Sequence, residues 1–179
     1  MKRIADFSSI ASVNTVKSYI AYLENSFLFK KIPKFDVSIK KQIYNPDKIY
    51  ICDNGFYNEL AFKISENLGV LFENVVFNEL IRMDGDIYYY KEDSFAIDFV
   101  TKHKEIFQLI QVCCDLSNTS TLEREKSSLM KGLEKFQLKE GLLINDSRDE
   151  IEQIGDKKII YIPLYKWLLN KYILKDELL

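Results

Sequence analysis

The order of the secondary-structure patterns between residues 66 and 144 constrains the fold of this chain most strongly. Residues 66–83 carry apolar side chains at helical spacing and are predicted to form a helix that Gly85 ends. Three strand patterns follow at 86–91, 95–101 and 105–113, then a charged helix at 121–137 and a fully apolar strand at 141–144. This α-β-β-β-α-β order predicts a mixed α/β (α+β) domain. A strand at 158–162 and a helix at 164–174 extend it.

The charge of the chain is unevenly distributed. Residues 1–50 contain 9 basic and 4 acidic side chains, a net of +5, whereas residues 51–179 contain 16 and 23, a net of −7. The two values sum to the formal charge of −2, so the chain as a whole carries no basic footprint for nucleic acid. This asymmetry, together with a change of pattern near Gly55, predicts two domains, residues 1–55 and 56–179.

The first domain has the pattern of a partial winged helix. Residues 12–26 predict a helix with Ser12 as its N-cap, because apolar side chains recur at steps of three and four along it. Residues 2–10 predict a short helix before it, and a Lys-rich loop between two strands, the second at 48–52, comes after it. A helix-turn-helix followed by a basic hairpin is typical of a winged helix. The alternative is a small helical lid with a solvated, Lys-rich loop.

Polar and basic side chains of this first domain are suited to nucleic acid. Small polar or basic groups can reach phosphates and base edges, and lysines in the hairpin can pair with phosphates. The candidate nucleic-acid-binding residues are Asn14, Thr15 and Lys17 on the helix and Lys40 and Lys41 in the hairpin. Duplex DNA is therefore the first partner to test.

Several classes of protein are excluded by what the sequence lacks. None of the six glycines is followed by lysine, so the chain has no phosphate-binding P-loop of its own. The single histidine, His103, excludes sites built from several imidazoles. Three cysteines without CxxC spacing indicate reduced, mostly buried thiols. No segment has the length and apolar character of a membrane span, so we expect a soluble, cytoplasmic protein.

The element order draws attention to one set of positions. A metal-dependent phosphodiesterase of this architecture holds Mg²⁺ with a carboxylate from the first helix, an Asp on the second strand and the Glu of an E-x-K pair on the third. Glu73, with Glu79 as second choice, lies on the helix, and Asp98 lies on the second strand. The third strand carries Gln111-Val112-Cys113 in place of E-x-K.

Four segments of the chain resemble a known domain. They are LFENVVFNEL, IDFV, LIQVCCDL and IIYIPLYKWLL, and their joint order resembles the uncharacterised C-terminal domain of many bacterial and archaeal AAA-type ATPases. The resemblance implies a winged helix followed by a PD-(D/E)XK, restriction-endonuclease-like fold, with an ATPase domain upstream or in trans. This sequence carries neither that ATPase domain nor the first helix of a complete winged helix. We therefore expect a C-terminal fragment or a reduced, stand-alone gene.

The resemblance maps the degenerate nuclease site onto Glu73, Asp98, Gln111 and Cys113, with Glu73 and Asp98 as ligands for Mg²⁺ or Mn²⁺. Gln111 keeps a ligand oxygen but removes a full negative charge, and a neutral thiol at Cys113 stabilises no charge on a phosphate. A lysine moved elsewhere, at Lys91 or Lys102, is the alternative source of a cation. In the other interpretation, Glu73 and Asp98 are held by hydrogen bonds alone.

Three hypotheses of different classes follow for the function. The first is a non-catalytic binding or regulatory module allied with an AAA-type ATPase, which engages nucleic acid or a partner. The second is a metal-dependent endonuclease that uses Glu73 and Asp98. The third is a protein-docking module for an ATPase ring or for a toxin or antitoxin. We expect the first, because both changes in the E-x-K pair weaken catalysis.

Overall fold

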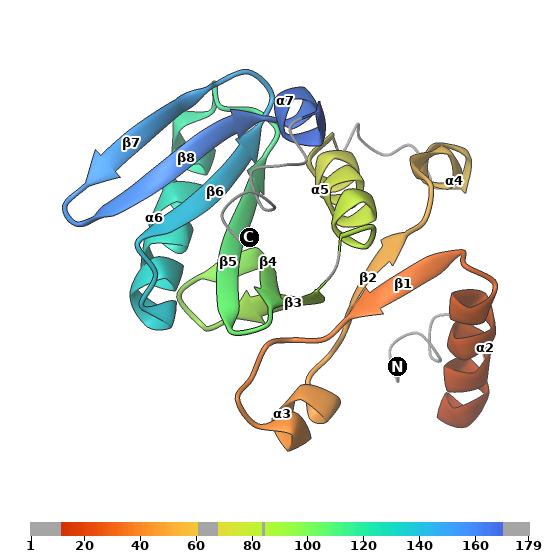
Figure 1. Cartoon of the computed structure of the whole chain (residues 1–179). Coiled ribbons are helices and arrows are strands. Elements are labelled where there is room, and N and C mark those ends of the chain that lie inside the picture. Colours follow the sequence, from red (N-terminus) through yellow and green to blue (C-terminus); the bar gives the residue numbers. More distant parts are fainter. Residues whose placement is uncertain (1–11, 61–67, 84, 170–179) are drawn as a thin grey trace. The chain divides into compact units, whose positions relative to one another are not determined.

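A computed structural model describes residues 12–60, 68–83 and 85–169. The chain forms two compact units (Figure 1). The first unit combines Met1–Lys31 with Ile49–Phe62, and the second combines Ile32–Lys48 with Lys63–Leu179. A stretch from the basic N-terminal part of the sequence therefore packs with the second unit, and we call residues 32–48 the strap. The separation at residues 55 and 56 stays a prediction.

The first unit is built around α2 (Val13–Asn25), which begins after Ser12 as predicted. Strands β1 (Phe29–Ile32) and β2 (Lys48–Ile51) form a two-stranded sheet, and α4 (Asn54–Leu60) follows. Within α2, Val16 and Ile20 are the buried residues, and Phe29 packs against the cluster that they form. The short helix predicted at residues 2–10 lies outside the described residues.

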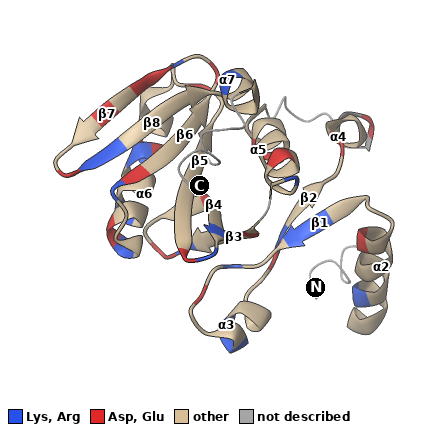
Figure 2. Ribbon diagram, in the orientation of Figure 1, with Lys and Arg blue, Asp and Glu red and all other residues tan. Residues whose placement is uncertain are grey.

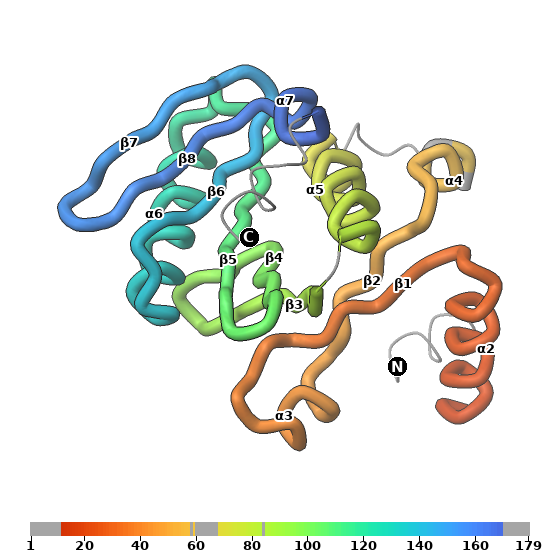
Figure 3. Tube along the Cα trace, viewed as in Figure 1, coloured from red at the N-terminus to blue at the C-terminus, as the bar shows by residue number. Residues whose placement is uncertain are grey.

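The segment between β1 and β2 differs from its prediction. The sequence predicts a loop, but the strap contains a short helix, α3 (Ile39–Tyr44), which Figure 3 shows between the two strands. Local hydrogen bonds explain the helix. The Asp36 carboxylate accepts from the backbone N–H of Ser38 at 2.9 Å, and the Gln42 side chain donates to the backbone carbonyl of Asp36 at 2.5 Å.

The second unit has the predicted α-β-β-β-α-β order, and its sheet is mixed. Strands β3 and β4 and strands β4 and β5 pair antiparallel, β6 is parallel to both β5 and β8, and β7 closes the far edge antiparallel to β8. The elements are α5 (Leu68–Leu80), β3 (Asp86–Lys91), β4 (Ala96–His103), β5 (Ile106–Cys113), α6 (Thr119–Phe136), β6 (Glu140–Asn145), β7 (Glu150–Ile154), β8 (Lys157–Pro163) and α7 (Leu164–Leu169).

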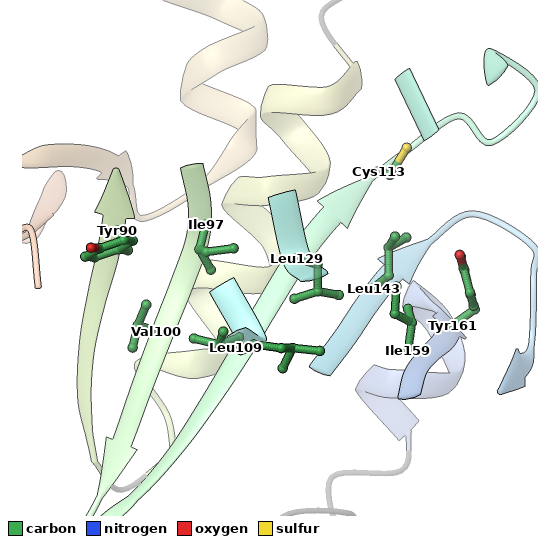
Figure 4. Close-up of a cluster of buried hydrophobic side chains, with 10 residues drawn as sticks. Tyr90, Ile97, Val100, Leu109, Cys113, Leu129, Leu143, Ile159 and Tyr161 are labelled. Atoms are coloured by element: carbon green, nitrogen blue, oxygen red, sulfur yellow. The ribbon is translucent and has the colours of Figure 1, made fainter. Parts of the chain in front are cut away.

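Helices cover both faces of this sheet, with α6 on one side and α5 and α7 on the other (Figure 1). The larger apolar cluster lies between α6 and the strands, where Leu129 lies beside Leu109 and Leu143 (Figure 4). Leu133 of α6 belongs to the same cluster. Gly132 allows this close approach, because a Cβ there would lie 2.8 Å from Cδ1 of Ile97. As predicted for a strand covered on both faces, β6 is buried at every position after Glu140.

Two details at the C-terminal side correct the sequence prediction. Strand β7 was not predicted. It pairs with β8 through a turn in which Gly155 has a φ of 62°, a conformation that favours glycine. Pro163 ends β8 rather than opening the last helix, which starts at Leu164. Residues 170–174 of that predicted helix lie outside the described part.

Across residues 12–60, 68–83 and 85–169, no helix has both the length and the apolar character needed to cross a bilayer.

Candidate functional site

The candidate site lies where β4 and β5 part. The antiparallel ladder between them runs from His103 and Ile106 to Phe99 and Ile110, and there it stops. From Ile110 onward, β5 pairs in parallel with β6 on its other side. Beyond this point the backbone groups on the β4 side of β5 have lost their strand partner and need another one.

Two polar side chains supply hydrogen-bond partners for backbone N–H groups at this point, one on each strand. The Asp98 carboxylate accepts a hydrogen bond from the backbone N–H of Val112 at 3.1 Å. In return, the Gln111 side-chain oxygen accepts from the backbone N–H of Asp98 at 3.2 Å. Asp98 and Gln111 therefore hold the two strands together across the point where they separate, and both residues have a structural role.

A third residue, Lys48, joins the carboxylates of the predicted site. Its Nζ lies 2.5 Å from Oε1 of Glu73 and 3.2 Å from Oδ1 of Asp98. The Glu73 and Asp98 side chains are 21% and 18% exposed, so their charges are only partly screened by water. The structure thus brings Glu73 and Asp98 together, as the mapping predicted, with an ammonium group hydrogen-bonded to both.

Sequence reasoning missed Lys48. The alternative cations predicted from the sequence, Lys91 and Lys102, both belong to the second predicted domain. Lys91 is exposed, and Lys102 forms an ion pair with Glu105 at 3.7 Å rather than with Asp98. Lys48 precedes the predicted domain boundary, and the one signal that the sequence offered is its place as the first residue of a predicted strand.

The electrostatics of the site favour a proton on Asp98. Burial and the neighbouring Glu73 carboxylate raise the pKa of Asp98 to about 7, although Lys48 and the Val112 N–H act in the opposite direction. The two carboxylates also raise the pKa of Lys48 above its ordinary value, despite the opposing effect of burial, so its ammonium is charged at neutral pH.

This arrangement makes stability depend on pH. Between about pH 4 and 7 the native state holds a proton on Asp98 that the unfolded chain has released, so the free energy of unfolding falls as pH rises. The neutral amide of Asp98→Asn does not titrate. We therefore expect the free energy of unfolding of this variant, relative to that of the natural chain, to increase by about 1 to 3 kcal/mol between pH 5 and pH 8. Urea unfolding of both proteins at each pH measures the difference. A difference that stays constant with pH would contradict the prediction.

Gln111 is engaged at both ends of its amide. Besides the bond to Asp98, its Nε2 donates to Oε2 of Glu125 on α6 at 2.5 Å, and Gln111 is 3% exposed. Arg124 contacts the other oxygen of Glu125, Oε1, at 2.5 Å. The amide therefore links β4 to α6, and both of its polar atoms are engaged in these bonds.

Cys113 lies inside the apolar cluster. It is 3% exposed, at one end of the group of side chains that Figure 4 shows, and its Sγ is 3.5 Å from the backbone oxygen of Asp115. Burial raises the pKa of this thiol to about 11, so it is neutral at physiological pH. The position carries a packing side chain where the nuclease pattern has a cation.

The remaining predicted residues are Glu79 and the candidate nucleic-acid-binding residues. Glu79 is buried on α5 and pairs at 3.2 Å with Arg82, which lies in the turn after that helix. Asn14 and Lys17 are exposed on α2 and Thr15 is half-buried, whereas Lys40 and Lys41 are exposed on α3. Each of these two sets belongs to its own unit of the chain.

The residues present do not fit the divalent cation that the resemblance implies. An ammonium already lies within hydrogen-bonding distance of both carboxylates, and a nearby Mg²⁺ would be repelled by it. Gln111, the expected third ligand, is committed to Asp98 and Glu125. Among the residues that the structure describes, no three Asp, Glu, His or Cys side chains form a metal-binding group.

Comparisons with known proteins define the family. A family model described as a domain of unknown function, DUF4143, matches residues 68–167, which is more than half of the chain. The chain belongs to the DUF4143 family. A second model, DUF8612, also described as a domain of unknown function, matches residues 1–67. The DUF4143 region contains all four residues of the mapped site but not Lys48, which lies in the DUF8612 region.

One relative shares most of this chain. An uncharacterised protein of Haemophilus influenzae is 28% identical over 159 residues, which cover 89% of this chain. The match spans only 38% of the relative. The similarity therefore concerns a part of a longer protein, and at 89% of this chain it overlaps both regions that the family models match.

Proposed function

We propose that this DUF4143 chain is a non-catalytic binding module, a winged helix followed by a restriction-endonuclease-like domain, allied with an AAA-type ATPase. The proposal rests on the side chains at the two positions where the nuclease pattern has Glu and Lys. Gln111 is bonded at both ends, and Cys113 is a buried, neutral thiol. These two positions give no cation for a phosphate and no free carboxylate for a metal.

Duplex nucleic acid is the partner that the exposed lysines support. Lys40 and Lys41 are adjacent on α3, which carries blue segments in Figure 2, and both are exposed. Neighbouring exposed lysines on a helix without buried residues can pair with the regularly spaced phosphates of a duplex. Asn14 and Lys17, exposed on α2, are of the residue types that contact phosphates and bases.

The ATPase alliance is proposed on two grounds. The four segments resemble a domain that follows AAA-type ATPase domains, and the match covers 38% of the Haemophilus influenzae relative, which leaves that relative ample length for another domain. In this proposal the ATPase domain is either on the same chain or in trans. The binding module would then couple the ATPase to nucleic acid.

The test of catalysis is direct. We expect no cleavage of supercoiled plasmid by the purified chain in Mg²⁺ or Mn²⁺, and Asp98→Asn serves as the matched control. Cleavage by the natural chain that Asp98→Asn abolishes would replace the proposal with the endonuclease that uses Glu73 and Asp98. Gel analysis over a time course distinguishes the two outcomes.

The test of binding uses salt. Each lysine that pairs with a phosphate adds about 0.9 to the slope of log affinity against log salt concentration, so Lys40→Ala with Lys41→Ala should flatten that slope by up to about 2. Fluorescence anisotropy with a labelled duplex at several salt concentrations measures it. Ile39→Ser with Ile43→Ser, on the same helix, is the matched control and should leave the slope unchanged.

A second candidate, protein docking, is favoured by the apolar side chains beside these lysines. Four of them stand unusually far into solvent, namely Val37 at 93%, Ile39 at 73%, Ile43 at 75% and Tyr44 at 80% exposed. Clustered exposed apolar side chains mark interaction surfaces. If the natural chain binds no duplex at low salt, docking on an ATPase or on a toxin or antitoxin becomes the leading function.

A further inference from the structure

The strap holds Lys48 in place through contacts at several points of its length. Near its start, the backbone N–H of Phe35 donates to the carbonyl of Tyr89 at 2.7 Å, and Tyr89 N–H donates to the Pro33 carbonyl at 3.2 Å. Near its end, the Tyr89 hydroxyl donates to the Pro46 carbonyl, two residues before Lys48. One residue of β3 thus fixes both ends of the strap.

An aromatic anchor adds to this attachment. The Phe35 ring packs edge-on against Tyr88 and Phe107 at centroid distances of 5.4 and 5.3 Å, and lies 5.3 Å from the ring of Phe136. Aromatic packing of this kind stabilises beyond the burial of area. The backbone that carries Lys48 is therefore held in place on the second unit. In many surface ion pairs, by contrast, a flexible lysine side chain loses conformational entropy when it pairs.

We infer that Lys48 is the resident cation of the pair formed by Glu73 and Asp98, and that it closes this pair to divalent metal ions. The inference deepens the proposed non-catalytic function and rests on it. Two carboxylates that approach each other with little water around them need a positive partner. In this chain that partner is a covalently attached side chain, so a cation already contacts both carboxylates without a metal. Lys48 is a positioning residue for both carboxylates.

The inference predicts that removing the ammonium opens the pair to a metal. Lys48→Met keeps an unbranched apolar stem but removes the charge, leaving two carboxylates with the backbone hydrogen bond that already orients Asp98. We expect this variant to bind one Mn²⁺ at least about tenfold more tightly than the natural chain, a difference of about 1.4 kcal/mol. The double variant Lys48→Met with Asp98→Asn should lose that gain.

The measurement is the loss of the free Mn²⁺ signal in electron paramagnetic resonance, with the full chain and Mn²⁺ as the probe. Lys41→Met, which removes the same charge from another place on the strap, is the matched control and should behave like the natural chain. If the natural chain binds Mn²⁺ as tightly as Lys48→Met, or if folded Lys48→Met gains no binding, the inference is wrong.

Folding of the variant is part of the same test. If circular dichroism shows that Lys48→Met is unfolded without metal, added Mn²⁺ should restore the folded spectrum, and failure to do so counts against the inference. Lys48→Gln, which keeps a hydrogen-bond donor, gives a second variant with the same expected gain of Mn²⁺ binding. Plasmid cleavage by the natural chain, scored separately, would overturn the proposed function itself.

Discussion

Cys113→Lys is expected to destabilise the chain by about 3 to 5 kcal/mol, because the new ammonium would lie among apolar side chains without a paired charge. The natural residue is 3% exposed in the cluster that α6 covers. In the sequence, lysine at this position restores the last residue of the E-x-K pattern. In the structure the same substitution damages the core.

The matched control is Cys113→Met, which has a similar length and no charge and should cost about 1 to 3 kcal/mol through overpacking alone. Urea unfolding of the two variants at pH 7 isolates the contribution of the charge. If Cys113→Lys is as stable as Cys113→Met, its ammonium reaches Glu125 or solvent, and the position is less enclosed than its burial indicates.

Gln111→Glu is expected to cost about 2 to 4 kcal/mol at pH 8. A carboxylate at this place would lose the donor that now contacts Glu125 at 2.5 Å and would face that carboxylate directly. It would also lie near Asp98, and it could still accept the hydrogen bond from the backbone N–H of Asp98. Three acidic groups would then compete for the positive charge of Lys48 and Arg124.

Acid should relieve this penalty. Gln111→Met removes the same hydrogen bonds without adding charge, so it should be the more stable variant at pH 8, and the two should converge near pH 5 as the added carboxylate is protonated. Unfolding midpoints across this range test the point. A Gln111→Glu variant as stable as the natural chain at pH 8 would mean that a cation or water separates the carboxylates.

Much of the second unit could be predicted from the sequence, because its elements have clear patterns. Strand β3 spans the predicted residues, and α6 begins near its predicted start because the Asn118 side chain caps it through the N–H of Thr121 at 3.1 Å. Elements that bury little were missed. Helix α3 has no buried residue, and β7 is a short edge strand whose Ile151 is 64% exposed.

The candidate site was predicted in part for a similar reason. Glu73, Asp98, Gln111 and Cys113 could be mapped because they lie on regular elements with defined spacing. Lys48 could not be, because its partners are 25 and 50 residues away in the sequence and no local pattern reports such a pairing. The twofold bonding of the Gln111 amide was equally hidden, since it depends on how α6 lies over β5.

The strap has a consequence for how regions of such proteins recombine. The two family models meet at residues 67 and 68, whereas Phe35 and Lys48 make their contacts on the far side of that junction. A chimera could join residues 1–67 of another protein to residues 68–167 of this one. It would keep the carboxylates of Glu73 and Asp98 and the aromatic rings against which Phe35 packs. The lysine and the phenylalanine that contact these groups would be present only if the other protein had them at the positions of Lys48 and Phe35. Residues 32–48 should therefore be transferred together with the sheet, and a chimera joined between residues 67 and 68 separates side chains that contact one another.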